Sequence, residues 1–320
     1  MAWQQRVLDL TYVAAWLIVA GTAFTLATTL AGWTGIWFSV FFQGVLPWLS
    51  IAVLLIGITS AFRSRWALVV FAALVVIAVG STLLPLARAH AAPAWAAGSP
   101  TITIVEANVL FEGNNRAAGA ARLRAIDADV FVLIEVNRAW VAELRAVGLL
   151  DTHPYQILAP SEHGGDGSAL LSRVPFADTN SAPLGLRSLE SITVTVGARR
   201  VRIALVHTQA PPTPRYVPRW IEDHRQLERF ASGSDPTIVV GDFNATYWHP
   251  PFRRLLAKGF RDAHDDMGFG LTMSWPTSPI GAMRLDHAIY RNGAAPISLH
   301  NFDVPGSDHR GFVATFAIKQ

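Results

Sequence analysis

Apolar residues are distributed unevenly along the chain. The first 98 residues contain long, almost uninterrupted apolar stretches, whereas the remainder alternates short apolar runs with polar segments. Three stretches, at residues 10–31, 36–58 and 66–86, each approach the ~20 residues that a helix needs to cross a bilayer core. They predict three transmembrane helices. A cleaved signal peptide is the alternative for the first stretch, but its apolar part is long for such a peptide and two further stretches follow.

The second stretch contains two residues that are unusual in a membrane span, Gln43 and Pro47. A membrane helix tolerates such residues where its neighbours satisfy the freed backbone groups. We therefore expect a packing kink in the second span and infer no transport role from it.

Basic residues near the spans predict the orientation, because Arg and Lys are retained on the cytoplasmic side. Arg6 precedes the first span, and Arg63 and Arg65 lie between the second and third. The loop at residues 32–35, between the first and second spans, has no charge. Three crossings then place the rest of the chain outside the cytoplasm, despite Arg88 after the third span. We expect a multi-pass protein of the cell membrane with an extracytoplasmic domain.

The remainder of the chain alternates strand-like and helix-like patterns after a linker rich in Ala, Pro and Gly. The predicted division is a membrane domain at 1–90, the linker at 91–100 and one further domain at 101–320. Runs of β-branched residues predict strands at 101–105, 130–134, 169–171, 191–196, 201–206 and 237–240. Apolar residues at helical spacing predict helices at 116–126, 218–230 and 251–257.

The spacing of these elements indicates the fold class. Only four residues separate the strands at 191–196 and 201–206, so they form a hairpin rather than a crossover. No Gly-rich phosphate loop follows a strand. We predict an α/β sandwich of two largely antiparallel or mixed sheets flanked by helices, and not a doubly wound nucleotide-binding sheet.

Composition narrows the function. The chain is 51% hydrophobic with a mean hydropathy of +0.32, and the excess lies in the predicted membrane domain. It has no cysteine, so the outer domain must fold without disulfides. Beyond residue 98 there are 22 basic and 22 acidic residues. Nonspecific binding of nucleic acid usually needs a strong basic excess, so this balance argues against bulk nucleic acid as a partner.

Polar residues recur at the points where strands should end. They are Asn108, Glu135, His207, Asp242, Asn244, Asp286, Asp308 and His309. A sandwich can bring strand ends to one edge, and carboxylate and amide oxygens are the ligands of hard divalent cations. The set therefore predicts a site for Mg²⁺ or Mn²⁺.

Taken singly, several polar residues are also typical of ordinary structural positions. An Asp-x-Asn sequence such as Asp242–Asn244 is common turn chemistry. His207 alone is more typical of a core histidine that bonds to backbone. Arg173 precedes a Val-Pro turn and is as typical of a surface arginine as of a phosphate ligand.

The ordered set resembles the endonuclease/exonuclease/phosphatase superfamily, the deoxyribonuclease I-like metal-dependent phosphoesterases. The resemblance covers residues 101–318, and its specific part is the order of the eight residues together with the sequences Gly-Asp-Phe-Asn at 241–244 and Ser-Asp-His at 307–309. The segments at 244–253 and 274–287 are similar to the membrane-tethered bacterial branch in particular.

The resemblance implies a role for each residue. Glu135 is implied as the principal metal ligand, with Asn108 and Asp308 close by, and Asp242 as the group that orients or deprotonates water. Asn244 is implied to hold the phosphate or the nucleophile. Asp286 is implied to accept a proton from the His309 ring. The residues implied to contact the phosphate are His309, His207, Asn108 and Arg173. Two features depart from the family: no tyrosine matches the phosphate-contacting one of some nucleases, and the acidic partner of His207 is open between Glu162 and Asp166.

These observations favour a membrane-anchored, Mg²⁺-dependent phosphoesterase that acts on a phosphate ester or pyrophosphate, with the bilayer and a lipid-linked phosphate as partners. An extracytoplasmic nuclease is the alternative, weakened by the neutral charge. A noncatalytic receptor for phosphorylated ligands is a third hypothesis, disfavoured because every catalytic residue type is present. No protein partner is inferred.

Overall fold

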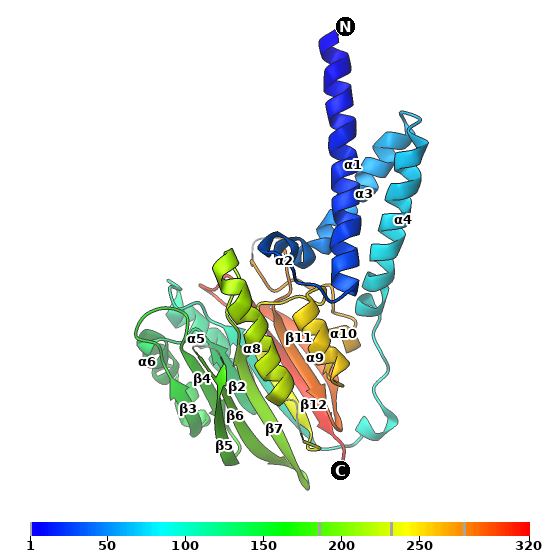
Figure 1. Cartoon of the computed structure of the whole chain (residues 1–320). Coiled ribbons are helices and arrows are strands. Elements are labelled where there is room, and N and C mark those ends of the chain that lie inside the picture. Colours follow the sequence, from blue (N-terminus) through cyan, green and yellow to red (C-terminus); the bar gives the residue numbers. More distant parts are fainter. Residues whose placement is uncertain (1, 185–186, 231–232, 278–279) are drawn as a thin grey trace.

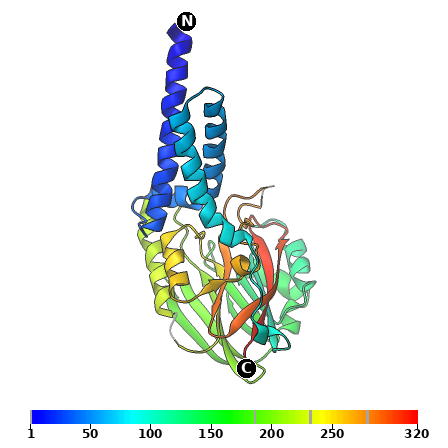
Figure 2. The same cartoon turned by 90° about the vertical axis from the view of Figure 1, so that its right-hand side faces the viewer.

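The computed structural model describes residues 2–184, 187–230, 233–277 and 280–320. It consists of a bundle of apolar helices that stands on a two-sheet sandwich, with a short connection between them (Figure 1). The view turned by 90° shows the same two parts stacked end to end (Figure 2).

The bundle contains four helices, α1 (Ala2–Leu30), α2 (Trp37–Gly44), α3 (Leu46–Ala61) and α4 (Trp66–Leu83). In the described residues, two helical segments, Asp9–Leu30 and Trp66–Ala87, are each long and apolar enough to cross a membrane. The pair α2–α3 is a third candidate, but it is bent by 75°.

The bend is sharper than the packing kink that the sequence predicts for the second span. Pro47 has no backbone N–H, and in a continuous helix its ring would clash with the carbonyl of Gln43. The chain therefore leaves the helix at Val45, which has φ −105° and ψ 16°, and restarts in a new direction. As a result α2 lies across the sandwich while α3 runs away from it (Figure 1).

The basic loop and the sandwich lie at opposite ends of the bundle. The N-terminus and the turn between α3 and α4, which contains Arg63 and Arg65, are at the end remote from the sandwich (Figure 1). The uncharged loop before α2 is at the near end. The length of α3 and α4 thus separates the basic turn from the sandwich.

Hydrogen bonds hold the bundle on the sandwich. Trp48 Nε1 donates to the Ala282 carbonyl at 2.8 Å, and Trp248 Nε1 donates to Thr82 Oγ1 at 3.0 Å. The connection follows α4 through η1 (Leu84–Ala87) and η2 (Ala94–Ala96) to the first strand.

The sandwich has two six-stranded mixed sheets, which confirms the predicted fold class. The first sheet has the order β11 (Ala294–Asp303), β12 (Arg310–Ile318), β1 (Thr101–Asn108), β2 (Val130–Ile134), β4 (Ser168–Ser172), β3 (Tyr155–Ala159). The second has the order β5 (Phe176–Leu184), β6 (Arg187–Val196), β7 (Arg199–His207), β8 (Thr237–Asp242), β10 (Asp286–Arg291), β9 (Arg261–Asp262). The pairs β1–β2 and β7–β8 are parallel, and the other pairs are antiparallel, including the predicted hairpin β6–β7.

Alternate residues of the central strands form the core between the sheets. Ile102 and Ile104 of β1 face this core together with residues of β7 and β8, such as Leu205 and Val240. Because side chains alternate across a strand, the intervening residues face outward and need helices to cover them.

Helices cover both outer faces. The first sheet is covered by α5 (Arg116–Arg124), α6 (Arg138–Ala146) and α7 (Leu149–Thr152), whose Leu123 and Trp140 pack on Phe131. The second is covered by α8 (Val217–Phe230), preceded by η3 (Pro214–Tyr216), and by α9 (Pro250–Ala257). The short α10 (Ala263–Asp266) lies near the bundle end of the connection, where His90 contacts Asp266.

Candidate active site

The strand directions bring polar residues from both sheets to one edge. Asn108, His207 and Asp242 are the last residues of β1, β7 and β8 and continue the inward-facing stripes of the core. Asp286 is the first residue of β10, which is antiparallel to β8, and therefore lies opposite Asp242 in the register. His309 precedes β12, which is antiparallel to β1.

The backbone at this edge adopts conformations that are rare for residues with side chains. Glu135, directly after β2, has φ 64°, and Asn244 has φ 46°. Such left-handed residues cost of order 1 kcal/mol or more and concentrate at functional sites. Gly241 has φ 145°, and a Cβ there would collide with the Val206 carbonyl oxygen, so only glycine fits before Asp242.

Asn108 connects the two sheets. Its Nδ2 donates to Glu135 Oε1 at 3.1 Å and to Asp242 Oδ2 at 3.3 Å, while its Oδ1 accepts from the Leu110 N–H at 3.1 Å. In this arrangement Asn108 orients two carboxylates, and its role as a metal ligand stays a prediction. Burial raises the pKa of Glu135 above its usual value, against the lowering effect of the Asn108 hydrogen bond.

Asp308 is fixed from the side by Trp275, a residue that the sequence pattern did not assign to the site. Trp275 Nε1 donates to Asp308 Oδ2 at 2.9 Å. The loop is closed by Ser307, whose Oγ donates to the Asn108 carbonyl at 2.7 Å and accepts from the His309 N–H at 3.0 Å. Asp308 is thus held beside Glu135 and Asn108.

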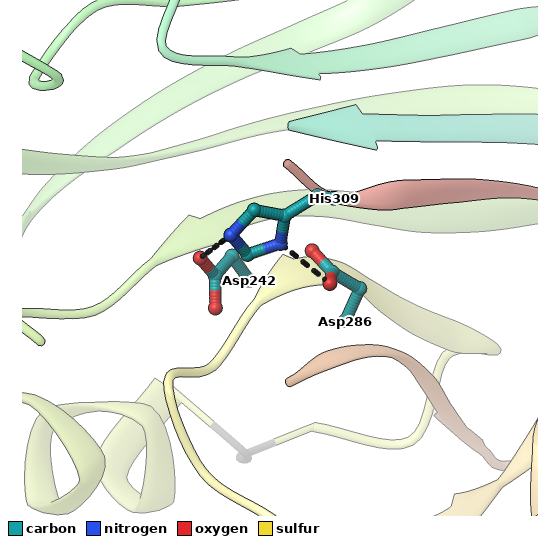
Figure 3. A group of neighbouring side chains, drawn as sticks. All are labelled: Asp242, Asp286 and His309. Carbon is teal, nitrogen blue, oxygen red and sulfur yellow. Dashed lines mark hydrogen bonds and ion pairs between the residues drawn. The ribbon is translucent and has the colours of Figure 1, made fainter. Parts of the chain in front are cut away.

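His309 lies between two aspartates (Figure 3). Its Nδ1 contacts Asp286 Oδ2 at 2.8 Å, and its Nε2 lies 4.0 Å from Asp242 Oδ2. Burial alone would lower the pKa of His309, but the charge and hydrogen bond of Asp286, followed by the charge of Asp242, outweigh burial and raise it to about 10. Near pH 7 the ring is therefore a cation that can donate from Nε2.

Asp242 has the protonation behaviour expected of a general base. Burial, and then the charge of Asp286, raise the pKa of Asp242 to about 7. A carboxylate with such a pKa can accept a proton from water near neutral pH. Asp242 Oδ1 also accepts from the Asn244 N–H at 2.7 Å, and Asn244 Nδ2 donates to the Thr208 carbonyl at 3.0 Å, so the Asp-Phe-Asn turn is rigid.

The donor set fits a hard divalent cation. Ligand atoms of Asp242, Asp286 and His309 lie within 4.8 Å of one another, but protonated His309 cannot offer a lone pair to a metal. Glu135 and Asp308 line the same cavity as Asp242 and His309, and the pKa of Glu135 is raised by burial and, as a smaller effect, by the charge of Asp308. Concentrated carboxylate oxygens of this kind suit Mg²⁺ or Mn²⁺.

His207 is also in the cluster, with its Nε2 3.9 Å from Asp242 Oδ2. Burial, and then the charges of Arg187 and His309, hold the pKa of His207 well below its usual value, so the ring is neutral. Both candidate acidic partners of this ring form ion pairs with arginines instead: Asp166 pairs with Arg187 at 2.9 Å, and Glu162 pairs with Arg138.

Arg187 is a site residue that the sequence did not identify. It is the first residue of β6, its side chain is 14% exposed, and it lines the same cavity as His207. Arg187 Nε is buried and has no hydrogen-bond partner among the described residues. Because β6 is antiparallel to β7, the first residue of β6 lies at the edge of the sheet where β7 ends. The sequence does not reveal this pairing, so it could not place Arg187 in the site.

Arg173, by contrast, does not lie at the site. It follows β4, which is antiparallel to β2, and the register pairs Ser172 with Val130 at the start of β2. Arg173 is therefore at the edge of the sheet remote from Glu135, where its Nη2 contacts Asp127 Oδ1 at 2.6 Å in an exposed position. This corrects the prediction that Arg173 contacts the substrate.

Glu106 is a second residue that the sequence pattern missed. It lies on β1 between Ile104 and Asn108 on the inward stripe and is fully buried beneath the site. Burial, and then the charges of Asp286 and Asp242, raise the pKa of Glu106 well above its usual value. A protonated Glu106 can donate a hydrogen bond to Asp286. The sequence signal for Glu106 is the alternation of inward-facing residues along β1, which continues past residue 105 to Asn108.

One cavity of about 730 Å³ lies over this cluster. Its polar end contains Glu135, Asp242, Asp308 and His309. The other end is formed by α2 and by apolar residues that include Pro211, Met283 and Leu285. The site therefore faces the helical bundle.

Comparisons with known proteins agree with this geometry. A family model described as the Endonuclease/Exonuclease/phosphatase family matches residues 105–309. A comparison with curated proteins finds no match.

Several solved structures are similar in fold. An endonuclease/exonuclease/phosphatase from Beutenbergia cavernae DSM 12333 is 20% identical with a TM-score of 0.56, over 68% of this chain and 72% of that chain. A family protein from Leptotrichia buccalis C-1013-b is 18% identical with a TM-score of 0.54, over 68% and 100%. D. rerio TDP2 complexed with a single-strand DNA product is 18% identical with a TM-score of 0.55, over 68% and 98%. At these identities the likeness shows the fold alone.

Proposed function

Because the chain belongs to the endonuclease/exonuclease/phosphatase family, we propose that it is a membrane-anchored, Mg²⁺-dependent phosphoesterase that hydrolyses a phosphate ester or pyrophosphate carried by a lipid. The family consists of metal-dependent phosphoester hydrolases. The observation that carries the lipid part of the proposal is that residues of the carboxylate cluster and of helix α2 line one and the same cavity.

The residues of the cluster suit the hydrolysis of a phosphoester. A divalent cation held by Glu135 and Asp308 would offset the negative charge of the phosphoryl group, which otherwise repels water. Asp242 accepts the proton of the attacking water. His309 donates from Nε2 to a phosphoryl oxygen, while Asp286 fixes the ring through Nδ1.

The position of the site supports a substrate that resides in the membrane. The bundle end of the sandwich carries the cavity, and α2 continues into the apolar helix α3 after the bend at Val45. A phosphate on a lipid headgroup can therefore reach the cluster while its chain stays near the bilayer. The basic turn at Arg63 and Arg65 lies at the remote end of the bundle, which supports an extracytoplasmic location for the site.

The test is phosphate release by the full chain in detergent with Mg²⁺, from polyprenyl pyrophosphate, phosphatidic acid and phosphoinositides. We expect release from at least one of these lipids and its loss in Glu135→Ala. Glu222→Ala is the matched control, because Glu222 lies on the outer helix α8, where it pairs with Arg225 and Arg229. Silence of the wild-type protein on all these lipids would contradict the proposal.

The alternative to a lipid phosphoesterase is a nuclease, because a solved structure of similar fold contains a DNA product. The equal numbers of basic and acidic residues beyond residue 98 provide no broad attraction for a nucleic-acid backbone. Nicking of plasmid DNA with Mg²⁺, combined with no release from lipids, would assign the site to nucleic acid.

A further inference from the structure

Helix α2 has two different faces where it borders the cavity. Val40 is 3% exposed and packs in the apolar cluster of the second sheet's outer face, with Trp220 and Phe252. The opposite face consists of Phe38, Phe41 and Phe42, which are 60%, 50% and 41% exposed. Their spacing of three and four residues places them on one side of the helix.

The buried face fixes α2 on the catalytic part. Trp37 Nε1 donates to the Pro211 carbonyl at 2.9 Å, and His249 Nε2 lies 2.8 Å from the Val40 carbonyl oxygen. Because these contacts hold α2 in place, the three exposed phenylalanines are a fixed surface, which we call the α2 aromatic face. It consists of Phe38, Phe41 and Phe42.

The α2 aromatic face is continuous with the phosphate-binding end of the site. All three phenylalanines line the same cavity as Asp242 and His309. Its volume of about 730 Å³ lies within the ~300–1,000 Å³ typical of pockets that hold whole drug-sized ligands, so there is room for more than a phosphate group. Exposed apolar side chains occur all over the helical bundle, but these three also line the cavity of the site, where an apolar part of a substrate can contact them.

We propose that the α2 aromatic face binds the first segment of the apolar chain of the lipid substrate and thereby makes the enzyme selective for phosphates on long chains. The proposal rests on the proposed lipid phosphoesterase function and adds the element that recognises the chain. A lipid chain is the expected occupant because the cavity connects two surfaces. The carboxylate cluster suits a phosphate, and α2 leads into the apolar helix α3.

The experiment compares one headgroup on two chain lengths. Geranyl and undecaprenyl pyrophosphate form one pair, and dihexanoyl and dioleoyl phosphatidic acid form the other. The measured quantity is the ratio of kcat/KM for the long chain to kcat/KM for the short chain. In the triple variant Phe38→Ser, Phe41→Ser, Phe42→Ser we expect this ratio to fall by about 30-fold, with short-chain activity within about 3-fold of wild type.

Two further variants make the outcome specific. Leucine at the same three positions keeps the surface apolar, so the ratio should stay within about 3-fold of wild type. Phe62→Ser is the matched control, because Phe62 is 87% exposed and caps the C-terminal end of α3, directly before the basic turn. It should leave the ratio unchanged.

The outcomes separate the two proposals. If the serine triple variant retains the wild-type ratio, or loses activity on both chain lengths equally, the role of the α2 aromatic face is refuted while lipid hydrolysis stands. If the wild-type protein releases phosphate from neither chain length of either headgroup, and from phosphoinositides of neither chain length, the proposed function fails and this inference fails with it.

Discussion

A buried ion-pair network next to the active site gives a prediction whose size follows from the structure. Asp262 Oδ2 contacts Arg284 Nη1 at 2.9 Å and His287 Nδ1 at 2.6 Å, and Arg284 Nη2 contacts Asp265 Oδ1 at 2.6 Å. The side chains of Asp262 and Arg284 are 0% and 4% exposed. The network fixes the segment that leads into β10 and thus positions Asp286.

The perturbation is Asp262→Asn. The substitution leaves Asp265 as the carboxylate that still pairs with the buried Arg284, so part of the Arg284 charge is uncompensated, which costs up to about 3–5 kcal/mol of unfolding free energy. For a domain of this size, that corresponds to a fall in melting temperature of roughly 6–20 °C. The matched control is Asp303→Asn, whose carboxylate is 79% exposed and pairs with Arg310 at 3.1 Å. An exposed pair of this kind contributes about 0–1 kcal/mol.

The effect should also depend on pH. Burial alone would raise the pKa of Asp262, but Arg284 and then His287 lower it well below its usual value. A folded-state pKa below the unfolded value of about 3.9 means that the stabilisation is present above pH ~4 and is lost as pH falls toward the folded pKa. The melting difference between wild type and Asp262→Asn should therefore be full at neutral pH and shrink in acid.

Thermal unfolding followed by circular dichroism in detergent, at several pH values between neutral and acid, measures this difference. A variant that melts within about 2 °C of wild type at neutral pH would refute the uncompensated-charge argument. So would a melting difference that stays constant into acid.

Three further predictions concern the site itself. Glu106→Gln should keep kcat within about 3-fold of wild type, whereas Glu106→Leu should lower kcat by about 10-fold. The reason is that only glutamine retains a hydrogen-bond donor toward Asp286. Equal losses of kcat in the two variants would contradict this role. Arg187→Ala should raise KM by about 10- to 100-fold with a smaller change in kcat, because a guanidinium hydrogen-bonds to phosphate; an unchanged KM in steady-state kinetics would exclude that contact. Trp275→Phe should raise the Mg²⁺ concentration for half-maximal activity by about 10-fold, because it removes the hydrogen bond that orients Asp308; a titration identical to wild type would argue against it.

The sequence predicted the sandwich because its central strands are buried and therefore carry long β-branched runs. The run at 130–134 corresponds to β2, and the run at 237–240 is β8 without its last two residues. Those last two residues are Gly241 and Asp242, which are polar or small for functional reasons and so shorten the hydrophobic signal. For the same reason β1 was predicted to end before Glu106.

Arg173 and Arg187 show what the sequence alone could not provide. Both lie next to a strand, and which edge of the sheet each occupies depends on the direction of that strand. Arg173 follows an antiparallel strand and lies remote from the site, whereas Arg187 begins one and lies in the site. For Asp286 and His309 the direction of the strands was not needed, because the family resemblance assigned both residues to the site.

The bend after α2 was also beyond the sequence. Pro47 identified a weak point, but whether a helix kinks or breaks depends on what the freed segment packs against. Here Val40 and Trp37 bind the second sheet's helices and the Pro211 loop, contacts across more than 170 residues of sequence.

The cluster at the site contains more carboxylates than the nearby positive charge of His309 can offset. Glu135, Asp242, Asp286 and Asp308 surround one cationic ring, His309, and burial raises the pKa of both Glu135 and Asp242. Carboxylates that are buried without enough positive charge destabilise the fold. A divalent cation held by these carboxylates would relieve that repulsion and would at the same time offer positive charge to a phosphate. The features that cost stability here, crowded acids and left-handed backbone at Glu135 and Asn244, are thus the ones that phosphoester hydrolysis requires.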